Sequence, residues 1–171
     1  VIDARGPEPG PPPAGAGFQK FVGLEVRLER EADLPRPIVM DATVEQRDGF
    51  RFLYLLPFAP GRLLAEDTCF SGTPALDQKA LRAGVLAYLE EQGLQPAEIL
   101  REEAGVLPMP WTAPEPQPEE EIITAGVRGG WFHPATGYAL PAAVRLAGRI
   151  ARNLGDPGLP QALASYRRHH E

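Results

Sequence analysis

The sequence has little cysteine, no excess of cationic residues and no long apolar run, and each shortage excludes a class of protein. Its single cysteine, Cys69, excludes an internal disulfide framework and a cysteine-based zinc site, and suits a reducing compartment. The net charge is −6 and no basic run could follow a phosphate backbone, which argues against nucleic-acid binding. No uninterrupted apolar segment approaches the roughly 20 residues that a membrane-spanning helix needs.

Catalytic signatures are equally scarce. The sequence shows no Ser/His/Asp arrangement, no metal-ligating cluster and no phosphate loop of the GxGxxG kind. His133 stands alone before a proline, which favours a structural role, and His169 and His170 are interpreted as solvated residues. Function must therefore be sought in less conspicuous residues.

The residues that are present suffice for one sizeable core. The chain has 171 residues, of which 43% are hydrophobic, so we expect residues 1–171 to form a single compact unit. It opens on Val1-Ile2-Asp3, a pattern typical of the end of a strand, without an initiator methionine, and it stops within a helical pattern at Glu171. We therefore expect it to be a piece of a longer protein.

Residues 18–108 carry the pattern of a mostly antiparallel sheet with one helix. Apolar and polar residues alternate from Phe18 to Arg30, which is typical of a half-buried strand. The Asp48-Gly49 turn predicts that the following apolar run returns antiparallel. The remaining predicted elements are strands at Ile38–Glu45, Phe50–Pro57, Arg62–Phe70 and Glu98–Pro108, and a helix at Ala75–Gln92. Together they indicate an α+β fold.

Three carboxylates in these strands break the alternation of apolar residues: Asp41, Glu66 and Asp67. Glu66 and Asp67 are adjacent in one strand, so they face opposite sides of the sheet. The predicted strand Phe50–Pro57 carries three aromatic residues, which would form an apolar wall. Loss of hydration beside this wall would favour the neutral form of a carboxylate, which makes a general acid or base available near neutral pH. The alternative is an edge-strand pair that keeps the sheet soluble. The Glu102-Glu103 pair is interpreted as solvated.

The stretch from Arg128 to Asn153 reads as a glycine-rich turn that leads directly into a helix. Pro141 fits the first helical position, and neither Ala139 nor Leu140 can cap the free N–H groups with a side chain. An uncapped helix N-terminus can hold a phosphate or an electron-rich ring oxygen. The alternative is a surface loop that enters an amphipathic helix.

Helical spacing also predicts which face of this last helix is apolar. The predicted apolar positions are Val144, Ala147, Ile150, Ala151 and Leu154, with Arg145, Arg149 and Arg152 on the other side. A strand at 122–127 is expected before the turn, and a final helix at Gln161–His169.

Five sequence blocks resemble a known family in the family's own order. They are VIDARG, GFQKFVGLEV, PIVMDATVEQRDGFRFLYLLPF, RLLAEDTCFS and GWFHPATGYALPAAVRLA. Together they cover nearly the whole chain and resemble the bacterial lycopene β-cyclases, which are flavoproteins of carotenoid biosynthesis.

This resemblance implies a fold and a cofactor. The fold would be part of a Rossmann-type FAD-binding protein, with residues 18–108 in the substrate domain and residues 1–6 and 122–154 returning to an FAD-binding domain that lies outside the chain. The cofactor would be reduced FAD, with NAD(P)H as reductant, and without the nucleotide-binding part the chain alone is expected to be inactive. The implied flavin contacts are Gly6, Pro134, Thr136, Gly137, Tyr138 and Leu140.

The resemblance also implies a reaction, the redox-neutral closure of lycopene ends into β-ionone rings by an isomerase. The AEDT segment resembles the family's acidic motif, so the acid would be Glu66, with Asp67 and Asp41 as further candidates. The aromatic residues Phe50, Phe52, Tyr54 and Trp131 would either shelter a carbocation or form plain core. Because the substrate dissolves only in membranes, the intact enzyme is expected to contact the bilayer peripherally, on the cytoplasmic side.

Two other functions remain open at this point. A flavoprotein of the same fold could be a monooxygenase or an isoprenoid reductase, which would consume NADPH in stoichiometric amounts. The sheet could also belong to a non-catalytic module that binds isoprenoids or lipids, in which case Glu66 would be dispensable.

Overall fold

A computed structural model describes residues 1–6, 15–32, 34–109, 122–133 and 136–168 of the chain. The contacts divide the chain into two compact units, Gly17–Pro108 on one side and Val1–Ala16 together with Met109–Glu171 on the other. The domain assignment made from the sequence stays a prediction.

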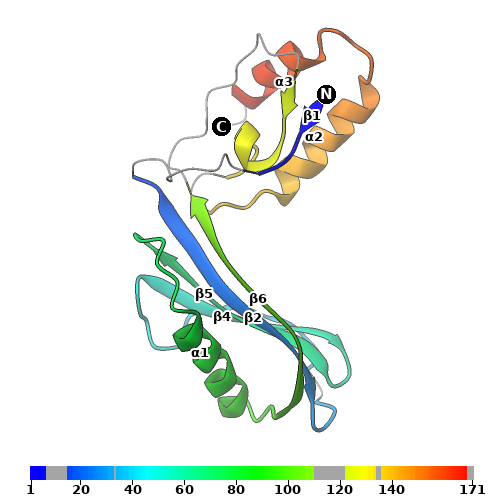
Figure 1. Ribbon diagram of the computed structural model, residues 1–171. Coiled ribbons are helices and arrows are strands. Elements are labelled where there is room, and N and C mark those ends of the chain that lie inside the picture. The colour runs from blue at the N-terminus through cyan, green and yellow to red at the C-terminus, as the bar shows by residue number, and fades with distance from the viewer. Residues whose placement is uncertain (7–14, 33, 110–121, 134–135, 169–171) are drawn as a thin grey trace. The chain divides into compact units, whose positions relative to one another are not determined.

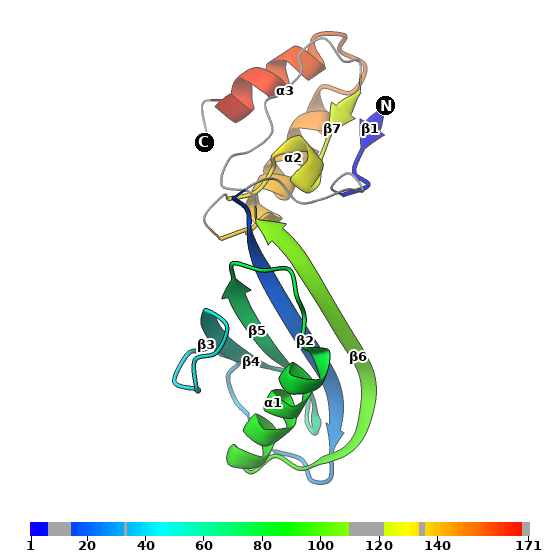
Figure 2. The same cartoon turned by 60° about the vertical axis from the view of Figure 1, so that its left-hand side comes forward.

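The first unit is built on a five-stranded sheet with the strand order β3-β4-β5-β2-β6 (Figure 1). Its strands are β2 (Gly17–Leu28), β3 (Ile38–Asp41), β4 (Phe50–Ala59), β5 (Arg62–Ser71) and β6 (Pro96–Met109). The pairs β3–β4, β4–β5 and β2–β5 are antiparallel, and the arrows of β2 and β6 also point in opposite directions (Figure 2). All five strands were predicted from the sequence.

Strand β3 is shorter than predicted, because it ends at Asp41 and not at Glu45. Its pairing with β4 shifts register between Ile38 and Asp41, and Met40 adopts a left-handed conformation with φ of 55°. Such a conformation makes a bulge in the strand, and the pairing with β4 ends one residue later, at Asp41.

Helix α1 (Gln78–Glu91) lies across one face of this sheet, as both views show (Figures 1 and 2). It starts later than the predicted Ala75, because Asp77 is the N-cap and accepts a hydrogen bond from the Ala80 N–H at 3.0 Å. Between the helix and the sheet lies the core, which consists of Val22, Leu24, Val26, Leu28, Leu53, Leu55, Leu63, Ala65, Val85, Tyr88, Leu89 and Leu94.

The second unit combines a short parallel pair of strands with two helices. Strand β1 (Ile2–Asp3) pairs with β7 (Ile123–Thr124), and a single 3-10 turn, η1 (Gly126–Gly129), follows β7. Helices α2 (Leu140–Arg152) and α3 (Leu159–Arg168) complete it. Its core includes Trp131, Leu146, Leu159 and Leu163. The predicted α+β class with two to three helices is confirmed.

The predicted apolar face of α2 is wrong at every position except Ile150. Leu146 is the buried residue, with Ala142 and Ile150 packed beside it, whereas the side chain of Val144 is 63% exposed. Both sets of positions have helical spacing, so periodicity could not choose between them. The contact with α3 decides: the Arg149 guanidinium lies 3.5 Å from the centre of the Tyr166 ring, which turns the Leu146 side of the helix inward.

None of the helices in the described residues is long and apolar enough to cross a membrane. No group of three or more His, Cys, Asp or Glu side chains in the same residues could hold a metal ion.

Candidate active site

The two faces of the five-stranded sheet have different chemistry. Side chains alternate along each strand, so residues paired across β4 and β5 share a face. Tyr54 pairs with Glu66, Phe52 with Thr68, and Phe50 with Phe70. These six residues therefore form one surface, here called the aromatic face, while helix α1 covers the opposite face.

The aromatic rings of this face pack on one another. The Phe52 ring centre lies 5.4 Å from those of Tyr54 and Phe70, and 5.5 Å from that of Phe50. Phe52 is only 1% exposed, whereas Phe50 is 47% exposed. The cluster is thus an apolar wall with an accessible rim, as its aromatic composition predicted.

Glu66 lies on the aromatic face and is half-buried. Burial raises the pKa of its carboxyl, and the nearby charge of Glu103 adds to this rise, against a hydrogen bond at 2.8 Å from the Thr68 hydroxyl to Oε1. The expected direction of the pKa shift is confirmed. The arrangement places a carboxyl group with a raised pKa beside an apolar surface, and the catalytic role of Glu66 stays a prediction.

Asp67 points to the opposite face and has a partner there. It is fully buried, and Arg51 donates three hydrogen bonds to it: from Nη2 to Oδ2 at 2.6 Å, and from Nε to Oδ1 at 2.8 Å and to Oδ2 at 3.1 Å. Burial raises the pKa of Asp67, and the Arg51 hydrogen bonds oppose this. Because a guanidinium keeps its proton, the carboxylate must stay ionised to compensate it. This geometry suits a structural ion pair and separates Asp67 from Glu66.

Gly84 of α1 has no side chain, and the Asp67–Arg51 ion pair occupies the space next to it. A Cβ at this position would lie 2.4 Å from Asp67 Oδ2 and 2.6 Å from Arg51 Nη2. We therefore expect Gly84→Ala to destabilise the sheet unit by about 1–3 kcal/mol, as overpacking does, measured by urea denaturation.

Gly148→Ala in α2 is the control. Its Cβ meets only the flexible end of Arg152, at 3.3 Å, so the better helix former should leave stability unchanged or improve it. Equal effects of the two changes would contradict this reading of Gly84.

Asp41 also lies apart from Glu66. It accepts hydrogen bonds from the Tyr88 hydroxyl at 2.5 Å and from the Thr43 hydroxyl at 2.6 Å. These bonds lower the pKa of Asp41, and the bond from the Thr43 hydroxyl has the largest effect. Because Tyr88 belongs to α1, Asp41 fastens the end of β3 to the helix.

The predicted flavin contacts lie in the second unit. In the turn before α2, Gly137 has φ of 68° and its N–H donates to the His133 carbonyl at 2.8 Å. Tyr138 and Leu140 are 60% and 62% exposed. Thr136 is exposed as well, Gly6 has φ of 85° with open space around it, and Pro134 lies outside the described residues.

The N-terminus of α2 is uncapped, as predicted. Ala139 is the cap residue and makes no side-chain hydrogen bond, and the first turn contains no acidic residue. This helix start can therefore accept an electron-rich group. It belongs to a different compact unit from Glu66. Trp131 is buried in the core of the second unit and donates to the Thr124 carbonyl at 3.0 Å.

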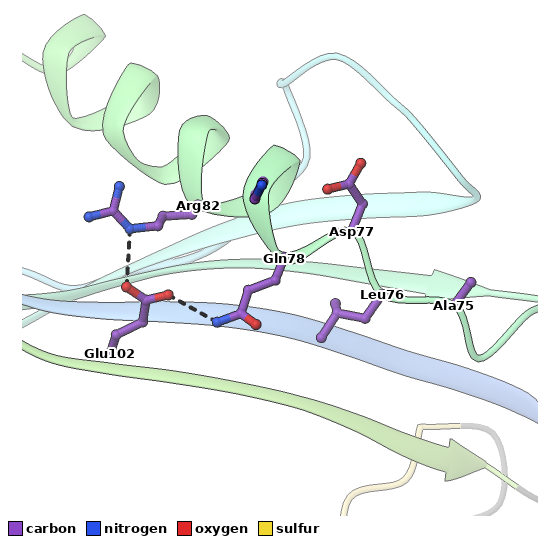
Figure 3. Close-up of a pocket in the computed structure, with 7 residues that line it drawn as sticks. Ala75, Leu76, Asp77, Gln78, Arg82 and Glu102 are labelled. Atoms are coloured by element: carbon purple, nitrogen blue, oxygen red, sulfur yellow. Dashed lines mark hydrogen bonds and ion pairs between the residues drawn. The ribbon is translucent and has the colours of Figure 1, made fainter.

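Sequence reasoning missed the difference between Glu102 and Glu103. Figure 3 shows Glu102 between Arg82 and Gln78, beside the start of α1, and the bonds to these residues are 3.0 and 3.1 Å long. Glu103 instead lies against Gly23, on the face of Glu66. Glu102 is exposed, as predicted, whereas Glu103 is only partly exposed, and each has a partner that the sequence did not indicate. Strand alternation already placed them on opposite faces and could have signalled this.

A family model described as lycopene cyclase protein matches residues 1–170 of the chain. The chain belongs to the lycopene cyclase family. Among relatives of this family, the lycopene beta-cyclase of a Paracoccus species is 44% identical over 166 residues, which is 92% of this chain and 42% of the relative. That of Pantoea ananas is 42% identical over 88% of this chain and 40% of its own length. The cyclase family was thus correctly identified from the five sequence blocks.

A lycopene beta-cyclase of Pseudescherichia vulneris is 39% identical over 99% of this chain and 45% of its own length. The chain therefore spans less than half the length of these cyclases. Among solved structures, a geranylgeranyl bacteriochlorophyll reductase-like protein from Thermoplasma acidophilum aligns with a TM-score of 0.56 at 12% identity, over 87% of this chain and 35% of that protein. The likeness shows that the cyclase-family chain shares its fold with part of that protein.

Proposed function

We propose that the protein containing this chain is a flavin-dependent lycopene β-cyclase that closes the linear ends of lycopene into β-ionone rings. The observation that carries the proposal is Glu66, a half-buried carboxyl with a raised pKa beside the aromatic wall of a chain that belongs to the lycopene cyclase family. A protonated carboxyl beside an apolar surface is what proton-initiated cyclisation of a hydrocarbon requires.

In this proposal Glu66 donates its proton to the terminal double bond of lycopene. The resulting carbocation closes the ring, and the Glu66 carboxylate then recovers a proton from the ring carbon next to the cation. One proton is given and one is returned, so the product is an isomer of the substrate and nothing is oxidised or reduced. The rings of Phe50, Phe52 and Tyr54 exclude water and attract the positive charge with their faces.

The second unit offers residues that fit a flavin. The uncapped start of α2 provides free N–H groups and a positive dipole end, and Gly137 adopts a conformation that favours glycine. Together with Gly6, Thr136, Tyr138 and Leu140, this turn would hold the ring system of FAD. A bound reduced flavin would supply negative charge, with NAD(P)H as the reductant that maintains it.

We also propose that the intact protein contacts the membrane peripherally from the cytoplasmic side. The support is chemical: a long hydrocarbon such as lycopene partitions into the bilayer, so an enzyme that acts on it must collect it there.

The test uses the intact protein in cells that accumulate lycopene, followed by purified protein with lycopene in vesicles. The expected product is cyclic and has the mass of lycopene, with far less NADPH consumed than product formed. A product heavier by one oxygen atom would establish a monooxygenase, and a hydrogenated product with matching NADPH consumption a reductase. Binding of lycopene without any conversion would establish a lipid-binding module. Each of these three outcomes would overturn the proposal.

A further inference from the structure

A second carboxylate lies next to Glu66 on the aromatic face. In the sheet, β2 lies between β5 and β6, and its Gly23 pairs with Glu66 of β5. A Cβ on Gly23 would lie 3.2 Å from Cγ and 3.4 Å from Oε1 of Glu103, which comes from β6. The Glu103 side chain thus occupies the space over β2 that any other residue at position 23 would fill.

The arginines near Glu103 and Glu25 do not compensate the two carboxylates equally. Arg101 contacts Glu103 at 3.2 Å, between Nη2 and Oε2, and also Glu25 at 3.5 Å, between Nε and Oε2. Glu25 receives a further hydrogen bond from Nε of Arg62 at 2.6 Å. Glu25 therefore has two guanidinium partners, whereas Glu103 shares one of them. The single guanidinium near Glu103 is thus divided between two carboxylates, so it compensates the charge of Glu103 only in part.

The other neighbours of Glu66 do not supply a counter-charge. Tyr54 faces it from β4, and burial, together with the charge of Glu66, raises the pKa of this phenol, so Tyr54 is neutral at neutral pH. Thr68 of β5 is uncharged, and the Asp67–Arg51 pair lies on the face covered by α1. Burial raises the pKa of Glu66 first, and Glu103 is the charged group that raises it further.

We propose that Glu103 is a positioning residue for Glu66: held over Gly23 with Arg101, its negative charge keeps a proton on the Glu66 carboxyl. This inference rests on the proposed function for its consequence, because the retained proton is the one that starts ring closure. The electrostatic part stands on the geometry of β5, β2 and β6 alone.

The direct test is a pH titration of the Glu66 carboxyl in the intact protein, by NMR with carbon-13-labelled glutamate and the Glu66→Gln spectrum for assignment. Glu103→Gln should move the Glu66 midpoint to lower pH. Glu102→Gln is the matched control, because it removes the same charge from the neighbouring residue on the other face of β6, where Arg82 and Gln78 hold it (Figure 3). It should leave the midpoint in place. Equal shifts in both variants, or none in Glu103→Gln, would overturn the inference.

The activity readout separates this inference from the proposed function. On the alkaline side of the profile, Glu103→Gln should reduce ring formation roughly threefold or more, since the protonated fraction above the midpoint falls tenfold per pH unit. On the acid side the variant should match the unmodified protein. A shifted NMR midpoint with an unchanged pH profile would contradict the role of Glu66 as the acid, whereas an unshifted midpoint contradicts only the role of Glu103.

Discussion

Replacing Glu66 by glutamine in the intact protein is expected to reduce ring formation about a hundredfold or more, the range by which a positioned general acid accelerates a reaction. Glutamine has nearly the same size and can still accept the hydrogen bond from Thr68, which is 2.8 Å long in the structure. It cannot donate a proton to a carbon–carbon double bond. The measurement is the yield of cyclic product per amount of folded protein in lycopene-accumulating cells.

Stability provides the internal control for this variant. The pKa of Glu66 is raised above its ordinary value of 4.5, so the folded state binds the proton more tightly than the unfolded state. Stability from this group is therefore present at low pH and is lost as pH rises from that ordinary value through the raised one. At neutral pH, Glu66→Gln should leave the melting temperature unchanged or increase it.

Glu98→Gln is the matched control for activity, because Glu98 is an exposed β6 residue paired with Arg27. It should cyclise lycopene at the unmodified rate. If Glu66→Gln were as active as Glu98→Gln, the catalytic role proposed for Glu66 would be refuted.

Replacing Asp67 by asparagine is expected to destabilise the sheet unit by about 3 kcal/mol or more. The change leaves the Arg51 guanidinium without a counter-ion in a place where its side chain is only 8% exposed, and breaking a buried ion pair from one side typically costs about 3–5 kcal/mol. The measurement is the free energy of unfolding from urea denaturation at neutral pH.

An exposed ion pair serves as the control for this buried pair. Glu45 pairs with Arg47, and both side chains are more than half exposed, at 70% and 58%. Glu45→Gln should therefore change stability by less than about 1 kcal/mol. If Asp67→Asn were as stable as Glu45→Gln but inactive, Asp67 would be catalytic and not structural, which would reverse the roles assigned to the two carboxylates.

The sequence predicted the sheet well because strand alternation is a local property. The five strands and their aromatic residues could be located from apolar spacing and turn residues. The opposite orientation of Glu66 and Asp67 followed from the same rule, and so did the uncapped start of α2, since Ala139 has no side chain that can cap.

Contacts between distant segments could not be predicted in this way. Nothing local to Asp67 indicates that Arg51 will meet it under Gly84, and nothing local to Glu103 indicates that it will lie over Gly23. The buried face of α2 was mispredicted for the same reason, because two sets of positions had helical spacing and the contact with Tyr166 of α3 decided between them.

The sequence by itself determined the family, the strands and the side of the sheet on which each strand residue lies, since these depend on residue order and on the period of the backbone. Only the tertiary structure decided which carboxylate is compensated by a guanidinium and which lies near a second carboxylate. That distinction depends on burial and on charges from other strands: Arg51 neutralises Asp67, whereas Glu103 opposes the ionisation of Glu66. Because both effects act through space, the order of residues along the chain does not reveal them.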